Sequence, residues 1–206
     1  VGDTYLLENA DGKYIFKIYR DAHRKLEEIK AEVELLNALH HAGASVAFPL
    51  LDLVSKYIQT FNAAEGTRHG VMFTYAEGNV VVDLNDDQLH TLGIEIAKIH
   101  EINAGLKLTH PRHEFNLDSM LFSPLNRIKP SFVGLETEYE YLVTTSGVVA
   151  ERINAMNLGS FSTGYCHYDF LPKNYHFNRA GKVTFFDFDF AGNIRIGFGI
   201  KQNALL

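Results

Sequence analysis

The sequence predicts an α+β fold with two lobes: a small antiparallel-sheet lobe with one helix, then a larger, mainly helical lobe. Strand-like segments cluster in the first 75 residues and do not alternate with helices. One long amphipathic segment interrupts these strands. After Glu77-Gly78 the hydrophobic periodicity becomes helical. We therefore expect an N-terminal lobe over residues 1–75 and a C-terminal lobe over residues 76–206.

The first predicted element is a hairpin over residues 4–20. Its two strands flank Asn9-Ala10-Asp11-Gly12, and residues of these types tolerate the backbone angles of a tight turn. Lys17 lies inside the apolar run of the second strand. Such a lysine can belong to an edge strand or can extend to solvent, and it can also serve a buried site.

The segment from Asp21 to His41 has the pattern of a long amphipathic helix that ends at Gly43. At about 100° per residue, Glu32 falls about 40° from Leu36, inside the apolar stripe, whereas Glu34 falls on the solvated side. A carboxylate on a buried face costs several kcal/mol unless a cation pairs with it. The pattern makes Lys17 a candidate partner of Glu32, with a solvated position at the rim of the stripe as the alternative.

The remaining elements follow in order along the chain. Strand-like segments cover residues 47–53, weakened by Pro49, then 56–63 and 69–78. In the second lobe we predict a helix from Asp83 to Asn103, capped near Asn85-Asp86, and another over residues 135–156. Residues 106–130 hold most of the prolines and are expected to be irregular.

Composition narrows the classes of partner. The chain has 206 residues, is 46% hydrophobic and carries a net charge of −6. It has no long basic run, so we expect no nucleic acid, and no apolar run near the roughly 18 residues of a membrane helix, so we expect no membrane partner. The single cysteine, Cys166, excludes an internal disulfide and favours a cytoplasmic location. Because the chain starts in a strand pattern and shows no closing helix, we expect that sequence is missing at one or both ends.

A phenylalanine-rich segment near the end carries two aspartates. Residues 175–177 and 183–188 resemble the strands of a hairpin, and pairing Asn178 with Val183 would place Asn174 opposite Asp187. Aspartate is disfavoured in strands, and a Mg²⁺ ion bound by oxygen ligands would explain its presence. Asp187 and Asp189 share a face of a regular strand, so only the register favours Asp187 as the ligand. We expect Asp189 to hydrogen-bond nearby backbone or to line the acceptor side.

The spacing of Asp169 and Asn174 matches a phosphoryl-transfer loop. In the kinase pattern H-R-D-x-x-x-x-N the Asp accepts the proton of the substrate hydroxyl and the Asn binds Mg²⁺. A downstream Asp supplies the second metal ligand, and a lysine of the sheet lobe pairs with a helix glutamate. Asp187, Lys17 and Glu32 occupy the corresponding places, so the sequence predicts a phosphotransferase.

The chain resembles the aminoglycoside phosphotransferase and choline kinase family, which has a protein-kinase-like fold. The usual catalytic loop H-G-D-x-H-x-x-N appears here as residues 167–174, and the metal motif as residues 186–188. Residues 14–20, 31–43, 71–78 and 92–102 are similar to the family's lysine strand, glutamate helix, hinge and first large-lobe helix. Two positions differ: Tyr168 replaces the usual glycine and Leu171 the second histidine.

The resemblance implies an ATP- and Mg²⁺-dependent kinase acting on a small-molecule hydroxyl, as in an aminoglycoside, choline, homoserine or a sugar. It implies phosphate binding by Lys17, oriented by Glu32, and Mg²⁺ binding by Asn174 and Asp187. It gives Asp169 the role of orienting and deprotonating the acceptor. The adenine edge would meet the backbone of the hinge residues, which are Met72, Phe73, Thr74 and Tyr75.

Three other functions stay open from the residues. A protein Ser/Thr kinase has the same broad fold, and a non-catalytic nucleotide-binding protein would keep the same pocket. The ten histidines could indicate a zinc hydrolase, but Pro111 lies inside their densest cluster, residues 110–114, and disfavours helical metal binding. His167 is expected to orient the catalytic loop, and Cys166 to be a buried small residue.

Overall fold

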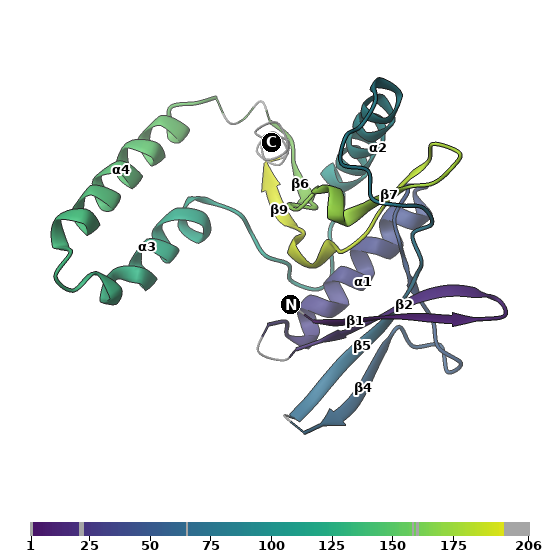
Figure 1. Ribbon diagram of the computed structural model, residues 1–206. Helices are drawn as coiled ribbons and strands as arrows, with labels where there is room; N and C mark the ends of the chain where they lie inside the picture. The colour runs from purple at the N-terminus through teal and green to yellow at the C-terminus, as the bar shows by residue number, and fades with distance from the viewer. Residues whose placement is uncertain (1, 21–22, 65, 158, 160, 196–206) are drawn as a thin grey trace.

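The computed structural model describes residues 2–20, 23–64, 66–157, 159 and 161–195. A twisted antiparallel sheet with one helix beside it forms the first lobe, and helices with two small sheets form the second (Figure 1). The predicted α+β, two-lobed kinase-like fold is therefore confirmed. The boundary near residue 75 stays a prediction. Within the described ranges, no helix combines the length and apolar character needed to cross a membrane.

The first sheet has five strands, and its turn chemistry agrees with the sequence. Strands β1 and β2 form the predicted hairpin, because Asn9 Oδ1 accepts hydrogen bonds from the backbone N–H of Asp11 (2.9 Å) and Gly12 (3.0 Å). The strand order is β1-β2-β5-β3, and β4 also pairs with β5. The bounds are β1 Asp3–Asn9, β2 Gly12–Tyr19, β3 Pro49–Leu50, β4 Ile58–Ala63 and β5 Gly66–Thr74.

The helix of this lobe, α1, spans Leu26–His41 and begins later than the sequence predicted. Residues 21 and 22 of the predicted start lie outside the described residues. The start is fixed by Lys25, whose backbone N–H donates to Glu28 Oε2 at 2.9 Å. The predicted stripe is buried, with Ile29 and Leu36 in one core with Val71 and Phe73 of β5. This packing fixes the face of α1 that carries Glu32.

The second lobe contains three helices among its described residues: α2 (Asp86–Ala104), α3 (Ser123–Ile128) and α4 (Glu136–Asn154). The prediction that residues 106–130 are irregular was wrong, because this segment contains α3 and a preceding π-helical turn, Asp118–Phe122. Pro124 lies in the first turn of α3, where a missing N–H costs no hydrogen bond. Helices α3 and α4 lie to one side, away from the five-stranded sheet (Figure 1).

Two small antiparallel sheets lie on either side, along the chain, of residues 167–174, the predicted catalytic loop. Strands β6 (Thr163–Cys166) and β9 (Gly192–Arg195) form one, which was not predicted. Strands β7 (Tyr175–Phe177) and β8 (Val183–Phe185) form the predicted hairpin.

The predicted register of this hairpin was wrong by one residue. Phe177 pairs with Val183, and the N–H of Phe186 donates to the carbonyl of Asn174 at 3.0 Å, so Asn174 faces Phe186 and not Asp187. The loop is one residue shorter than assumed, because Asn178 N–H already bonds Lys182 O at 3.0 Å. Strand β8 also ends at Phe185 instead of Phe188.

A single core joins the two lobes. The chain after α1 runs along β8, where Phe185 N–H donates to Ser45 O (2.9 Å) and its carbonyl accepts from Ala47 N–H (2.8 Å). Leu35 of α1, Val71 of β5 and Phe185 belong to one buried cluster. The hairpin with the predicted metal ligands is thus held beside the helix with Glu32.

Candidate active site

A cavity of about 240 Å³ opens where β2, α1, the end of β5 and the hairpin meet. Most of the predicted site residues line it, but Met72 and Asp169 are outside its lining. Met72 pairs with Phe16 and Leu50 inside the sheet. The described lining residues include Ile15, Lys17, Glu32, Leu36, Ala47, Phe73, Thr74, Tyr75, Ala76, Lys173, Asn174, His176, Phe186 and Asp187.

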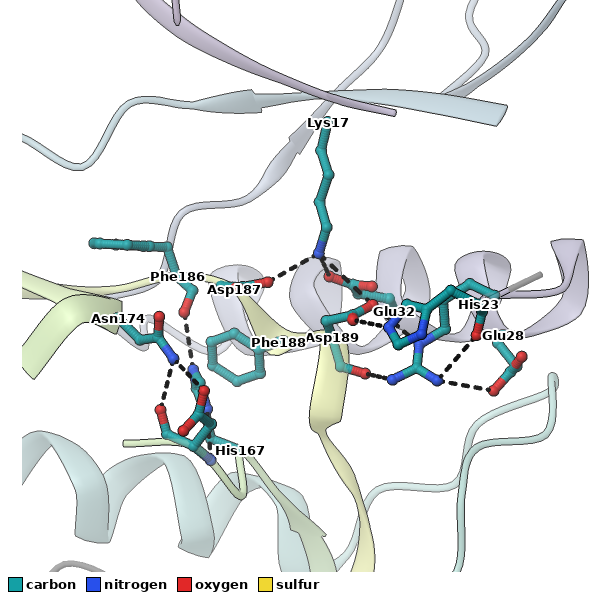
Figure 2. Close-up of polar contacts among 12 residues, drawn as sticks. Lys17, His23, Glu28, Glu32, His167, Asn174, Phe186, Asp187, Phe188 and Asp189 are labelled. Atoms are coloured by element: carbon teal, nitrogen blue, oxygen red, sulfur yellow. Dashed lines mark hydrogen bonds and ion pairs between the residues drawn. The ribbon is translucent and has the colours of Figure 1, made fainter. Parts of the chain in front are cut away.

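Lys17 is the centre of charge in this cavity. Its Nζ lies 2.9 Å from Asp187 Oδ1, 3.5 Å from Glu32 Oε1 and 3.7 Å from Asp189 Oδ1 (Figure 2). Burial alone would lower the pKa of the ammonium, but these carboxylates, Glu32 first, outweigh it and raise the pKa above its usual value. Lys17 is therefore a permanent cation, and its predicted approach to Glu32 within about 4 Å is confirmed.

Glu32 is buried as the helical pattern predicted, with a relative exposure of 1%. Its Oε1 contacts Lys17, whereas Oε2 has no hydrogen-bond partner among the described residues. Glu34 was expected to point to solvent, and it lies on the half-exposed side of α1, but its carboxylate has protein partners there. Its carboxylate accepts from Thr109 N–H (2.8 Å), Thr109 Oγ1 (2.9 Å) and His110 N–H (3.3 Å). Glu34 thus ties α1 to a distant segment, a contact that helical periodicity could not show.

The catalytic loop brings Asp169 and Asn174 together. Residues Pro172–Asn174 form a 3₁₀ turn, and Asn174 Nδ2 donates to both the carbonyl oxygen and Oδ2 of Asp169, each at 2.8 Å. The amide oxygen of Asn174 then points away from the two hydrogen bonds that its Nδ2 donates (Figure 2). Lys173 Nζ lies 3.2 Å from Asp169 Oδ2. Asn174 is thus oriented with its oxygen available to a cation.

His167 supports this loop from the core. It is fully buried, its Nε2 lies 2.9 Å from Phe186 O, and its Nδ1 lies 3.2 Å from Asp169 N. Because Nδ1 accepts the Asp169 N–H, Nε2 carries the proton and donates to Phe186 O. Burial lowers the pKa of His167 to about 4, so the ring is neutral at about pH 7. The neutral ring links the predicted catalytic loop to the segment that carries Asp187.

This burial predicts a pH-dependent stability. The folded pKa of about 4 lies below the usual 6.5, so the unfolded chain binds more protons between these values. Neutral His167 therefore contributes its full share to the free energy of unfolding above about pH 6.5. About 3 kcal/mol of that free energy is lost as the pH falls towards 4. Urea unfolding of the native protein and His167→Gln at pH 7, 5.5 and 4.5 measures it. A stability difference between the two proteins that does not change with pH would contradict the assignment.

Tyr168 has a backbone conformation that glycine adopts without strain, which agrees with the glycine at this place in the motif that the sequence resembles. Its backbone φ is +68°, in the left-handed region that costs an L-residue about 1 kcal/mol. The ring stacks on Phe115 with centroids 3.9 Å apart and an interplanar angle of 10°. A stack of this kind contributes about 1 kcal/mol beyond burial, so it offsets the strain.

Two truncations of Tyr168 separate the strain from the stack. Both Tyr168→Ala and Tyr168→Gly lose the stack, but only glycine relieves the left-handed backbone. We expect the glycine variant to be more stable than the alanine variant by about 1 kcal/mol in urea unfolding. Tyr165 in strand β6 is the matched control, because alanine should be the more stable there. The same order at both positions would contradict the argument.

The two aspartates of the metal motif lie in different environments. Asp187 has φ +59°, lies past the end of β8 at Phe185 and directs a carboxylate with 44% relative exposure into the cavity. Asp189 follows in a 3₁₀ turn, is only 6% exposed, and binds Arg24 Nε and His23 Nε2, each at 3.0 Å. Despite its burial, Lys17 and Arg24 lower the pKa of Asp189 to about 2.

The shared face predicted for these aspartates was therefore wrong, because the strand ends before either residue. We expected Asp189 to hydrogen-bond nearby backbone or to line the acceptor side. Its carboxylate instead binds two side chains from the segment before α1, His23 and Arg24.

Sequence reasoning missed the residues that anchor the metal loop. Arg112 donates to the carbonyl groups of Phe188, Asp189 (2.8 Å), Ala191 (2.7 Å) and Glu28 (3.0 Å). Its guanidinium thus clamps the turn after Asp187 onto α1. Little in the sequence indicated this role of Arg112, because a single arginine between two histidines belongs to no helical or strand periodicity.

Comparison with known proteins finds relatives over most of the chain. A model of the phosphotransferase enzyme family matches residues 2–197. An uncharacterized protein of Synechocystis sp. is 30% identical over 93% of this chain and 54% of its own length. Amicoumacin kinase of Bacillus subtilis is 26% identical over 87% of this chain and 52% of its own length. The chain thus spans about half the length of these relatives.

A solved structure shows the same fold. Amicoumacin kinase hAmiN, in complex with AMP-PNP, Ca²⁺ and Ami, superposes with a TM-score of 0.75 at 20% identity. The match covers 97% of this chain and 59% of that chain.

Proposed function

Because the chain belongs to the phosphotransferase enzyme family, we propose that it carries the catalytic machinery of an ATP- and Mg²⁺-dependent kinase acting on a small-molecule hydroxyl. One observation carries the proposal. Lys17 of the sheet lobe and Asn174 and Asp187 of the second lobe line one cavity, and Asp169 is hydrogen-bonded to Asn174. A charged lysine, two oxygen ligands and a carboxylate base are the groups that phosphoryl transfer needs.

The nucleotide end of the site is the edge near β5. Phe73, Thr74 and Tyr75 line the cavity, and β5 ends at Thr74. The N–H of Thr74 already donates to Phe48 O at 3.0 Å, so the backbone of Tyr75, just past the strand, is the better candidate for the adenine edge. Met72 remains a weaker candidate because it lies within the sheet.

The phosphate end is set by charge. Lys17 would hold the α- and β-phosphates, and Glu32 would keep it in place through the 3.5 Å contact. In this structure Lys17 is nearest to Asp187, so nucleotide binding would exchange part of that ion pair for phosphate oxygens.

Asn174 and Asp187 fit a hard divalent cation. The Asn174 amide nitrogen donates two hydrogen bonds to Asp169, so the Asn174 amide oxygen is left as the ligand atom. The Asp187 carboxylate lines the same cavity. Two protein oxygens are few for Mg²⁺, but Mg²⁺ sites of this kind take further ligands from phosphate and water. A bound Mg²⁺ would neutralise charge on the phosphate oxygens.

Asp169 is proposed to orient the acceptor hydroxyl and to take its proton. Oδ2 accepts from Asn174, which fixes the carboxylate relative to the metal ligands. The backbone N–H of Asp169 donates to His167, so the base is held from both sides. Catalysis would arise mainly from positioning and charge stabilisation.

The test is a labelled-ATP screen with the whole protein. The acceptor panel comprises aminoglycosides, choline, homoserine, sugars, amicoumacin and a generic protein, with Mg²⁺ present and absent. Metal-dependent transfer to a small molecule supports the proposal. Phosphate transfer to the generic protein substrate, and to none of the small molecules, would favour the protein-kinase alternative. Nucleotide binding without transfer to any acceptor or water would favour a non-catalytic nucleotide-binding protein.

A further inference from the structure

Lys173 is a second cation beside the cavity, after Lys17, and no motif in the sequence singled it out. It lies in the 3₁₀ turn Pro172–Asn174, directly before the proposed metal ligand Asn174. Its Nζ is 3.2 Å from Asp169 Oδ2, and its side chain also lines the cavity that Lys17 and Asp187 line. Lys173 therefore joins the proposed base to the proposed phosphate site.

The ion pair between Lys173 and Asp169 is weak enough to exchange. The Lys173 side chain has a relative exposure of 65%, and exposed pairs of this kind contribute about 1 kcal/mol or less. Lys17 differs, because its side chain is 12% exposed and three carboxylates lie within 4.0 Å. Lys17 is thus held in place by its carboxylates, whereas the exposed Lys173 side chain can leave Asp169 for another negatively charged group.

The cavity also lacks positive charge for its proposed ligand. Of the described residues that line it, Lys17 and Lys173 are the lysines, and Glu32 and Asp187 are carboxylates. The charge of Lys17 is already balanced by those carboxylates and by Asp189. A transferring phosphoryl group spreads negative charge over its three outer oxygens and requires a cation beside them.

We propose that Lys173 is a catalytic residue that binds the γ-phosphoryl group during transfer; this inference rests on the proposed function. As the acceptor oxygen bonds to the γ-phosphorus, the bond from phosphorus to the β–γ bridging oxygen breaks and ADP leaves. Lys173 moves from Asp169 Oδ2 to a γ-phosphoryl oxygen when the nucleotide binds and keeps this contact during transfer, and the acceptor proton passes to Asp169. This exchange frees the carboxylate before it has to accept the proton.

The experiment uses binding, so it does not require a known acceptor. Affinities for AMP-PNP and ADP, each with Mg²⁺, are measured by calorimetry for the whole native protein, Lys173→Ala and Lys173→Arg. Loss of one charge-assisted hydrogen bond should weaken AMP-PNP binding about tenfold in the alanine variant. ADP lacks the γ-phosphoryl group, so its affinity should change less than about twofold. Arginine should restore most of the AMP-PNP affinity.

Lys182→Ala is the matched control, because Lys182 is an exposed lysine in the nearby β7–β8 loop and does not line the cavity. If Lys173→Ala does not fold, Lys173→Gln is used, with the melting temperature as the check. Equal loss of AMP-PNP and ADP affinity, or no loss of either, overturns the inference. A change confined to the KM of an acceptor found by the screen also overturns it, since Lys173 would then contact the acceptor. If the native protein binds neither nucleotide, the proposed function itself fails.

Discussion

Asp169→Asn is expected to lower turnover by a factor on the order of 10³, while nucleotide affinity changes less than about threefold. The carboxamide keeps the size of the side chain, and its oxygen can still accept the hydrogen bond from Asn174 Nδ2. It cannot take a proton, so only the chemical step should suffer. Asp169 also lies outside the lining of the cavity in which the nucleotide is proposed to bind.

Single-turnover kinetics and calorimetry with AMP-PNP measure these two quantities on the same preparation. Asp87→Asn is the control, because Asp87 is an exposed carboxylate in the first turn of α2. Turnover with the best acceptor that stays within a few-fold of the native rate would remove Asp169 from the role of base. A large loss of nucleotide affinity would instead place it in the nucleotide site.

Substitution of the two motif aspartates should separate metal binding from folding. Asp187→Asn should lower metal-dependent turnover on the order of a hundredfold or more, with little change in the melting temperature. Asparagine tolerates the left-handed backbone at φ +59°, so the loop should keep its shape. Asp189→Asn should instead destabilise the fold by about 3 kcal/mol or more, because it removes the buried charge that pairs with Arg24 and His23 and leaves the Arg24 guanidinium without its buried carboxylate.

The readouts are thermal unfolding and the Mg²⁺ dependence of AMP-PNP binding. For Asp187→Asn, added Mg²⁺ should no longer tighten AMP-PNP binding. For Asp189→Asn, any protein that remains folded should still respond to Mg²⁺. The opposite pattern, with metal dependence lost in the Asp189 variant and stability lost in the Asp187 variant, would reverse the assignment of the metal ligand.

The candidate site could be predicted in large part because several of its signals are local. The burial of Glu32 follows from its angle on a helix whose apolar stripe must face the sheet. The position of Lys17 follows from alternation along β2, and together they predicted a contact that the structure confirms at 3.5 Å. The separation of Asp169 and Asn174 fits a loop closed by a single 3₁₀ turn.

The arrangement of the metal motif could not be predicted in the same way. A strand pattern assumes regular backbone, but β8 ends at Phe185 and Asp187 then adopts a left-handed conformation. A three-residue loop in place of a four-residue one also shifted the hairpin register. Asp187 nevertheless lines the cavity with Asn174, because the change of backbone direction compensates for the shifted register.

The sequence by itself determined which side chains are the candidates for the proposed phosphoryl transfer, and which faces of α1 and β2 present two of them. Only the tertiary structure decided that Asp189 pairs with His23 and Arg24, and that Arg112 clamps the loop after Asp187. The reason is physical. Periodicity reports how a residue lies relative to its own helix or strand, whereas ion pairs and backbone clamps join segments far apart in the chain. Their energies depend on distances that exist only once the core has packed.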